Sequence, residues 1–249
     1  MGTFRALQNR AAAMNQRLVE FSGLEPELVE NILQYAKSLL KSSSNEIDET
    51  VFTAQMVDQF EITSTFMVSQ MAEALKKGNK NFLATSESGR QRGIPLEDFC
   101  RMVCTFLSQK LDIKINWVFG VYDTNNDGSL SKLEMHILLK PCVLHTEDMD
   151  LDEAIRDLIE IVMSVVDVNK NGLIDLEEFR HLVKTNILYI DLLGQVLPRD
   201  HVVKKFLQKI KNKSPNQVAM LFQNERARAL TEAPLSKPPA LYPIQLEIP

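Results

Sequence analysis

Side chains that carry oxygen recur at fixed spacing in two twelve-residue segments, 123–134 (DTNNDGSLSKLE) and 167–178 (DVNKNGLIDLEE). A Ca²⁺ ion takes six to eight oxygen ligands, and a loop of this length can supply them from positions 1, 3, 5, 7, 9 and 12. Both segments have an acid or amide at positions 1, 3 and 5, and both end in a glutamate that can bind with two oxygens. The pattern therefore predicts two calcium sites.

Each expected ligand can be assigned by its position in the loop. The first set is Asp123, Asn125, Asp127, the main-chain carbonyl of Ser129, Ser131 acting through water, and Glu134. The second set is Asp167, Asn169, Asn171, the main-chain carbonyl of Leu173, Asp175 and Glu178. We expect Gly128 and Gly172 at position 6 because the chain turns sharply there and a Cβ would clash. Mg²⁺ could compete with Ca²⁺ for either set.

A surface turn rich in Asp and Asn could produce one such match by chance. Two complete matches, both flanked by apolar residues three and four apart, favour metal binding over that alternative. Position 8 is apolar in both loops, where it is occupied by Leu130 and Ile174. We expect these two residues to pair as a short two-stranded bridge that couples the sites.

Apolar periodicity predicts helices along most of the chain, with Ser22 and Glu25 as a capping box for the second of them. The expected helices cover residues 3–21, 25–41, 49–60, 65–75, 94–111, 115–122, 133–139, 154–166, 176–185, 199–213 and 215–230. The apolar seam of the first helix favours packing on its own domain, with a short coiled coil or a partner-binding helix as alternatives.

Two helix–loop–helix units before residue 111 lack the order of acids that a metal needs, and we interpret both as degenerate metal-binding units. The loop of the second unit, 76–93, holds five basic residues and one acid, so it would repel a divalent cation. It could contact an acidic partner or remain solvated.

The segments after the second calcium loop have three distinct compositions. Residues 186–197 are strongly apolar and are expected to fold back as an internal plug. Residues 199–213 form a basic amphipathic pattern, which favours a docked helix with a solvated lysine face over an acidic-protein or membrane contact. Residues 231–249 contain five prolines and predict an extended tail. We therefore expect four parts: 1–110, 111–197, 198–230 and 231–249.

The overall composition excludes several classes of protein. The net charge of −5 argues against bulk nucleic-acid binding. No apolar run approaches the roughly eighteen residues of a membrane span, and no signal-peptide core is present. The three cysteines, Cys100, Cys104 and Cys142, are too few for a disulfide framework and favour a reducing, cytoplasmic setting. Cys100 and Cys104 lie four residues apart and are expected to be core thiols, with a disulfide or metal role for these two as the alternative.

Two degenerate units followed by two intact ones resemble the neuronal-calcium-sensor branch of the EF-hand proteins. Residues 94–200 resemble the calaxin-type ciliary EF-hand proteins. The segments that carry this resemblance are FLSQKLDIKINWVFGVYDTNNDGSLSKLEM, DLIEIVMSVVDVNKNGLIDLEEF and LLGQVLP. The resemblance implies an all-α, four-hand array, to which the pattern of this chain adds N- and C-terminal helices and an extended tail. It also implies calcium sensing on the axoneme, with dynein or its docking complex as protein partner. A structural position on microtubules is the alternative, and its partner would be tubulin. The basic insertion at 76–93, the lysine-rich helix and the proline-rich tail depart from that pattern.

No catalytic motif is present, and the four histidines are scattered, so we do not expect an enzyme. The favoured function is a calcium sensor or adaptor on a protein assembly. Such a sensor would bind its partner in a groove that contains methionines, such as Met102, Met135 and Met163. Methionine is also a common residue of protein cores, so this feature alone does not decide the function. The alternatives are a structural subunit of ciliary doublet microtubules, stabilised by calcium, and a cytosolic calcium buffer.

Overall fold

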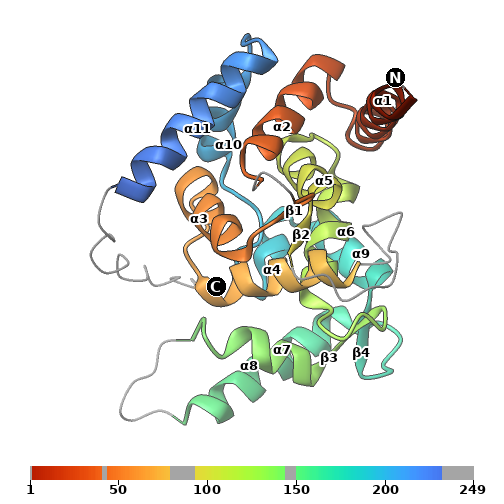
Figure 1. The fold of residues 1–249 in the computed structure, drawn as a ribbon. Coiled ribbons are helices and arrows are strands. Elements are labelled where there is room, and N and C mark those ends of the chain that lie inside the picture. The colour runs from red at the N-terminus through yellow and green to blue at the C-terminus, as the bar shows by residue number, and fades with distance from the viewer. Residues whose placement is uncertain (1, 41–43, 79–92, 144–149, 232–249) are drawn as a thin grey trace.

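The computed structural model describes residues 2–40, 44–78, 93–143 and 150–231, and the side chains of all these except 2–10 and 225–231. The described chain is almost entirely helical (Figure 1). Its helices are α1 (Gly2–Ser22), α2 (Pro26–Ser38), α3 (Glu49–Phe60), α4 (Thr65–Lys77), α5 (Leu96–Leu107), α6 (Leu111–Tyr122), α7 (Lys132–Leu139), α8 (Leu151–Val166), α9 (Leu176–Thr185), the 3₁₀ helix η1 (Ile187–Asp191), α10 (Asp200–Ile210) and α11 (Pro215–Thr231).

Four of the helix–loop–helix units associate as two pairs, and a short antiparallel bridge joins the loops of each pair. In the first pair (α2–α3 with α4–α5), β1 (Glu46–Ile47) meets β2 (Ile94–Pro95). In the second pair (α6–α7 with α8–α9), β3 (Ser129–Ser131) meets β4 (Leu173–Asp175). The predicted all-α, four-hand array is therefore confirmed.

Each bridge contains one pair of apolar residues that face each other across the two strands. Leu130 lies opposite Ile174 in the second pair, as the sequence predicted. Ile47 lies opposite Ile94 in the first pair, which the sequence analysis did not predict. All four side chains are buried, so each bridge is anchored by apolar contact as well as by hydrogen bonds.

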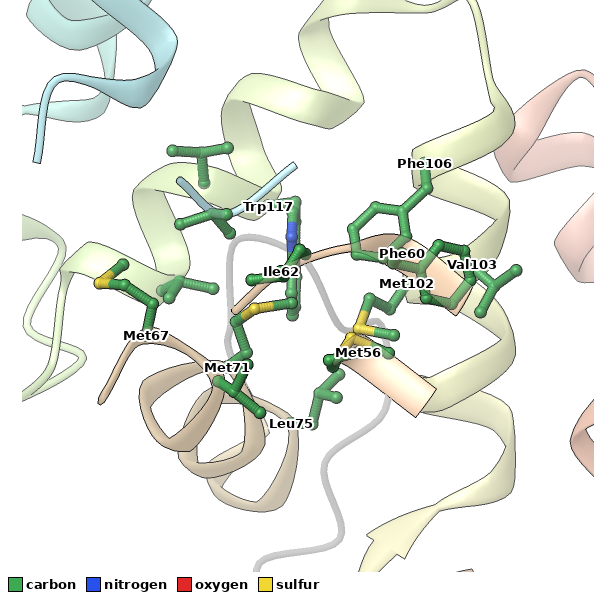
Figure 2. Close-up of a cluster of buried hydrophobic side chains, with 14 of the residues drawn as sticks. Met56, Phe60, Ile62, Met67, Met71, Leu75, Met102, Val103, Phe106 and Trp117 are labelled. Carbon is green, nitrogen blue, oxygen red and sulfur yellow. The ribbon is translucent and has the colours of Figure 1, made fainter. Parts of the chain in front are cut away.

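A continuous apolar core connects the first pair to the first helix of the second pair. Figure 2 shows side chains of α3, α4 and α5 pointing toward one another and toward Trp117 of α6. The rings of Phe106 and Trp117 meet edge-on with their centroids 6.4 Å apart. Methionines fill much of this space, and Met102, Met135 and Met163 are all buried. Met102 and Met135 are fully buried core residues, whereas Met163 also lines a shallow pocket beside the second loop together with Glu160 and Ser164.

The first helix packs on its own domain, against α2 and α5, as the sequence favoured. Leu18 is fully buried, and Arg17 forms a two-pronged ion pair with Glu97 at 2.9 Å. The predicted capping box is wrong, because Ser22 belongs to the end of α1 and donates its hydroxyl to the carbonyl of Leu18. The second helix begins at Pro26 without a side-chain cap and ends at Ser38, three residues before the predicted end.

The basic amphipathic helix is docked, as predicted. Val202, Phe206 and Ile210 of α10 are buried. The following helix, α11, lies across α2, where Phe206 and Phe222 approach Tyr35 with ring centroids 5.2 and 4.3 Å apart (Figure 1). The predicted tail, apart from its first residue, lies outside the described residues, as do most of the basic loop 76–93 and residues 144–149.

The segment between α9 and α10 folds back, as predicted, although only in part. Ile190, Leu193 and Val196 are buried, whereas the three residues that precede them, 187–189, are exposed. Cys100 and Cys104 are buried free thiols, which confirms the core reading for these two, and Cys142 is an exposed free thiol.

Candidate metal centre

The first loop begins where α6 ends, and its first expected ligand is already ordered by the main chain. Asp123 directly follows Tyr122 and is only 3% exposed. Its Oδ1 accepts a hydrogen bond from the N–H of Asp127 at 3.1 Å, and its Oδ2 accepts one from the N–H of Gly128 at 2.9 Å. The loop therefore curls around the carboxylate of its own first residue.

The far end of the same loop is closed by its last expected ligand. Glu134 is the third residue of α7 and forms a capping box with Ser131. One carboxylate oxygen of Glu134 accepts from the N–H of Asn125 at 3.2 Å, and the other accepts from the N–H of Ser131 at 2.9 Å. Glu134 therefore belongs both to the first turn of α7 and to the hydrogen bonds that close the loop.

The second loop repeats this arrangement. Asp167 accepts from the N–H of Asn171 at 3.1 Å and from the N–H of Gly172 at 2.8 Å. Glu178 accepts from the N–H of Asn169 at 3.3 Å and from that of Asp175 at 3.1 Å, again within a capping box. Two loops with different side chains thus adopt one main-chain design.

Conformation, not space, explains the glycine at position 6 of each loop. Gly128 and Gly172 have φ angles of +95° and +81°. A Cβ built on either residue would meet no other atom within 4 Å, so the expectation of a clash was wrong. The positive φ is what disfavours other residues there. Asn126 and Lys170 at position 4 also have positive φ, 59° and 58°.

The first loop is the more enclosed of the two, because Asp123 and Glu134 are buried whereas Asp167 and Glu178 are only half-buried. Burial is the main reason that the pKa of Asp123 is raised, and repulsion from Glu134 and Asp127 adds to it, while two main-chain N–H groups act in the opposite direction. The pKa of Asp127 is lowered, chiefly by hydrogen bonds from Ser129. A cation among these groups would relieve the repulsion between the carboxylates.

The donor set fits a hard divalent cation. Both loops offer carboxylate, amide and main-chain carbonyl oxygens, with no sulfur or nitrogen ligand among the expected positions. In the described part of the chain, no three His, Cys, Asp or Glu side chains converge into a ready-made cage. Such a cage is not expected for these loops, because amide and carbonyl oxygens supply a large share of the ligands.

The bridge register places apolar residues at two ligand positions of the first unit. Ile47 aligns with Leu130 and Ile174 at position 8, which places Leu40 at position 1 and Val51 at position 12. Two apolar side chains thus stand where the two most important carboxylates would be required. The sequence-based interpretation of a degenerate unit is supported by this register.

The second degenerate unit holds an acid that the sequence analysis did not single out. Ile94 at position 8 places Asp98 at position 12, where the intact loops have glutamate. Asp98 is half-buried, and this burial raises its pKa to about 7. The only available signal in the sequence was its distance of four residues from Ile94, which has no meaning until the bridge is known.

Two further residues connect the first loop to its surroundings. The hydroxyl of Thr124 lies 3.1 Å from Glu134 Oε1 and donates to it. Lys77, the last residue of α4, donates from Nζ to the carbonyl of Thr124 at 3.3 Å. The first pair therefore contacts the calcium loop of the second pair directly, and no sequence pattern indicated this contact.

Comparison with known proteins agrees with this geometry. The model of the EF-hand domain pair matches residues 112–184, which are the second pair of helix–loop–helix units. It is similar to calaxin of Xenopus laevis, with 26% identity over 206 residues, covering 80% of this chain and 92% of the relative. It is also similar to calaxin of Danio rerio, with 26% identity over 82% of this chain and 93% of the relative.

A more distant relative is named as a regulator of another protein. Guanylyl cyclase-activating protein 1 of Gallus gallus is 22% identical over 145 residues, which cover 58% of this chain and 72% of the relative. These matches are to binding and regulatory proteins and not to an enzyme family. Within the described residues, no helix combines the length and the apolar character needed to cross a membrane.

Proposed function

We propose that this protein is a calcium sensor and adaptor that binds two Ca²⁺ ions in its second pair of hands. The observation that carries the proposal is the shared main-chain design of the two loops, joined at Leu130 and Ile174. The proposed ligands are those assigned from the sequence: Asp123, Asn125, Asp127, Ser129, Ser131 and Glu134 in one loop, and Asp167, Asn169, Asn171, Leu173, Asp175 and Glu178 in the other. Mg²⁺ is the expected competitor.

The response to calcium would be confined to the second pair. A bound Ca²⁺ ion supplies the positive charge that draws the carboxylates of one loop together. Glu134 and Glu178 each lie in the first turn of an exit helix, so their movement would reorient α7 and α9. The first pair has apolar residues at ligand positions and carries α10 and α11 on its surface, so it would serve as a fixed platform.

We propose the ciliary or flagellar axoneme as the location, with a protein of the dynein arms, their docking complex or the microtubule as partner. The similarity to calaxins over most of the chain supports this assignment. We retain the division into residues 1–110, 111–197, 198–230 and 231–249 as a proposal, in which the last two parts distinguish this chain from a minimal four-hand protein.

A structural role in the same assembly is the second candidate. It is favoured by the aromatic cluster of Tyr35, Phe206 and Phe222, which fixes the C-terminal helices on the first pair. In that case calcium would stabilise the second pair and would not switch it. A calcium buffer would need no such platform.

Calorimetric titration with Ca²⁺ in the presence of Mg²⁺ tests the proposal. The native chain should bind two ions, the variants Glu134→Gln and Glu178→Gln one each, and the double variant none. Glu177→Gln is the matched control, because Glu177 neighbours a ligand and pairs instead with Arg180. A double variant that still binds two ions would overturn the ligand assignment.

The fluorescence of Trp117, the one tryptophan of the chain, separates the two candidates. Trp117 is buried in α6, six residues before Asp123. A sensor should show a calcium-dependent change in Trp117 emission together with uptake of a hydrophobic dye. Binding of two ions with neither change would favour the structural role.

A further inference from the structure

The outer face of α8 and the start of the loop after it carry apolar side chains that no described residue covers. Ile161, Val165 and Val168 are 63%, 65% and 71% exposed. With the half-buried Ala154 and Leu158 they recur at alternating spacings of four and three residues. This is the spacing of a seam that packs against another helix. Single exposed apolar residues are ordinary, but an aligned row of them indicates an interaction surface.

The row is separate from the face that α8 uses within its own domain. Ile155, Ile159 and Val166 are buried, and α8 packs through that face against α7, α9 and β4. The helix is therefore apolar over two adjoining faces, which is more than the fold requires. A helix that is apolar over most of its circumference is normally buried.

Charge along the row selects the kind of partner. Glu153, Asp157 and Glu160 are exposed on the flank of the row, and within the described residues Glu153 and Asp157 form no ion pair. Glu160 is paired with Lys132 of α7 at 2.6 Å. A second copy of this chain would bring a like acidic flank against this one, which is unfavourable. A helix that carries lysine or arginine beside its apolar row would be complementary.

We propose that the outer face of α8 together with Val168 of the following loop, within residues 154–168, is a docking surface for a helix of a partner protein with an apolar row and basic flanks. This inference names the partner chemistry for the adaptor function proposed above and rests on that function. The surface ends inside the second calcium loop, because Val168 is its position 2 and donates its N–H to Glu178 at 3.1 Å. A docked helix would therefore contact the loop that holds the second ion.

The probe for the test is a synthetic helix of about 18 residues, cross-linked to stay helical, with leucines spaced alternately by four and three and lysines on both flanks. A second probe of the same design has glutamates in place of the lysines. Binding of each fluorescently labelled probe to the full chain is measured by anisotropy, in saturating Ca²⁺ and in chelator. We expect the lysine probe to bind and the glutamate probe not to bind.

Variants of the chain locate the binding. Ile161→Glu and Val165→Glu should each lower the affinity for the lysine probe by about 10-fold or more, as expected for residues at the centre of an interface. Asp157→Lys should lower the affinity for the lysine probe by about 3-fold to 10-fold and make that affinity less dependent on salt concentration. The control is Val57→Glu, because Val57 is an exposed apolar residue on α3 and should not affect binding. Circular dichroism verifies that each variant is folded.

Three results would overturn the inference. The first is equal binding of the lysine probe to the native chain and to Ile161→Glu, and the second is no binding of that probe at all. The third is a dimer in analytical ultracentrifugation that Ile161→Glu abolishes, which would assign the face to a second copy. Calcium titration of the same samples keeps the two proposals apart, since two bound ions without probe binding would contradict only the docking surface.

Discussion

The hydroxyl of Tyr122 donates a hydrogen bond to the main-chain carbonyl of Gly194 at 2.7 Å and lies 3.2 Å from that of Ile190. Tyr122 is the residue immediately before the first calcium ligand, Asp123, and it is fully buried. Gly194 belongs to the segment that folds back after the second calcium loop. One side chain thus connects the start of the first loop to the plug that follows the second.

We predict that Tyr122→Phe lowers the free energy of unfolding by about 1 to 2 kcal/mol, because buried carbonyls lose their hydrogen-bond donor. Urea denaturation of the calcium-loaded chain measures this change. Tyr189→Phe is the control, since Tyr189 lies in the exposed part of the same segment. Equal stability of the native chain and Tyr122→Phe would contradict the structural role assigned to this contact.

Substitutions at the position-6 glycines distinguish strain from lack of space. Because the φ of Gly128 is +95° and its surroundings are open, Gly128→Ala should weaken calcium binding at the first loop through a backbone cost of about 1 to 2 kcal/mol. Gly128→Asn should weaken it less, since asparagine tolerates positive φ better than alanine does. Calorimetry of both variants is the measurement. A larger loss for the bulkier asparagine would mean that space is limiting after all.

The stability of the first pair should depend on pH through Asp98. Burial raises the pKa of Asp98 to about 7 in the folded chain, whereas an unfolded aspartate titrates near about 4. Between these values the folded state retains a proton that the unfolded state has lost, so this contribution to stability falls as the pH rises from about 4 to about 7.

Asp98→Asn should remove that dependence and leave the chain more stable than the native one at pH 8, by about 1 to 3 kcal/mol. Urea denaturation gives the free energy of unfolding of both chains between pH 5 and pH 8. The difference between the two values at each pH isolates the contribution of Asp98. Glu153→Gln, at an exposed acid of α8, is the control and should show no such difference. If the difference in unfolding free energy stays constant across this pH range, Asp98 is not the origin of the pH dependence.

The three cysteines should differ in reactivity toward an aromatic disulfide reagent. Cys100 and Cys104 are buried, and burial raises the pKa of both thiols, that of Cys104 to about 12, so neither supplies thiolate at neutral pH. Cys142 is exposed and free. One thiol should therefore react quickly in the native chain and three in denaturant, and Cys142→Ser should abolish the fast phase. Rapid reaction of two or more native thiols would mean that α5 opens readily.

The sequence by itself determined the features that depend on short spacing. The proposed calcium ligands of each loop lie within twelve residues of one another, so they could be assigned from loop position alone. The helices are marked by apolar residues three and four apart, so most of them could be predicted without a structure. The Leu130–Ile174 bridge followed from the same loop positions.

The tertiary structure alone decided which distant residues meet. It paired Ile47 with Ile94, placed Asp98 at a ligand position, and brought Asn31 to the carbonyl of Ile210, 179 residues away in the chain. It also assigned Ser22 to the end of α1, where the local pattern had indicated the start of α2. The physical reason is that burial and long-range hydrogen bonds depend on the packing of whole helices, and no local spacing records which helices will become neighbours.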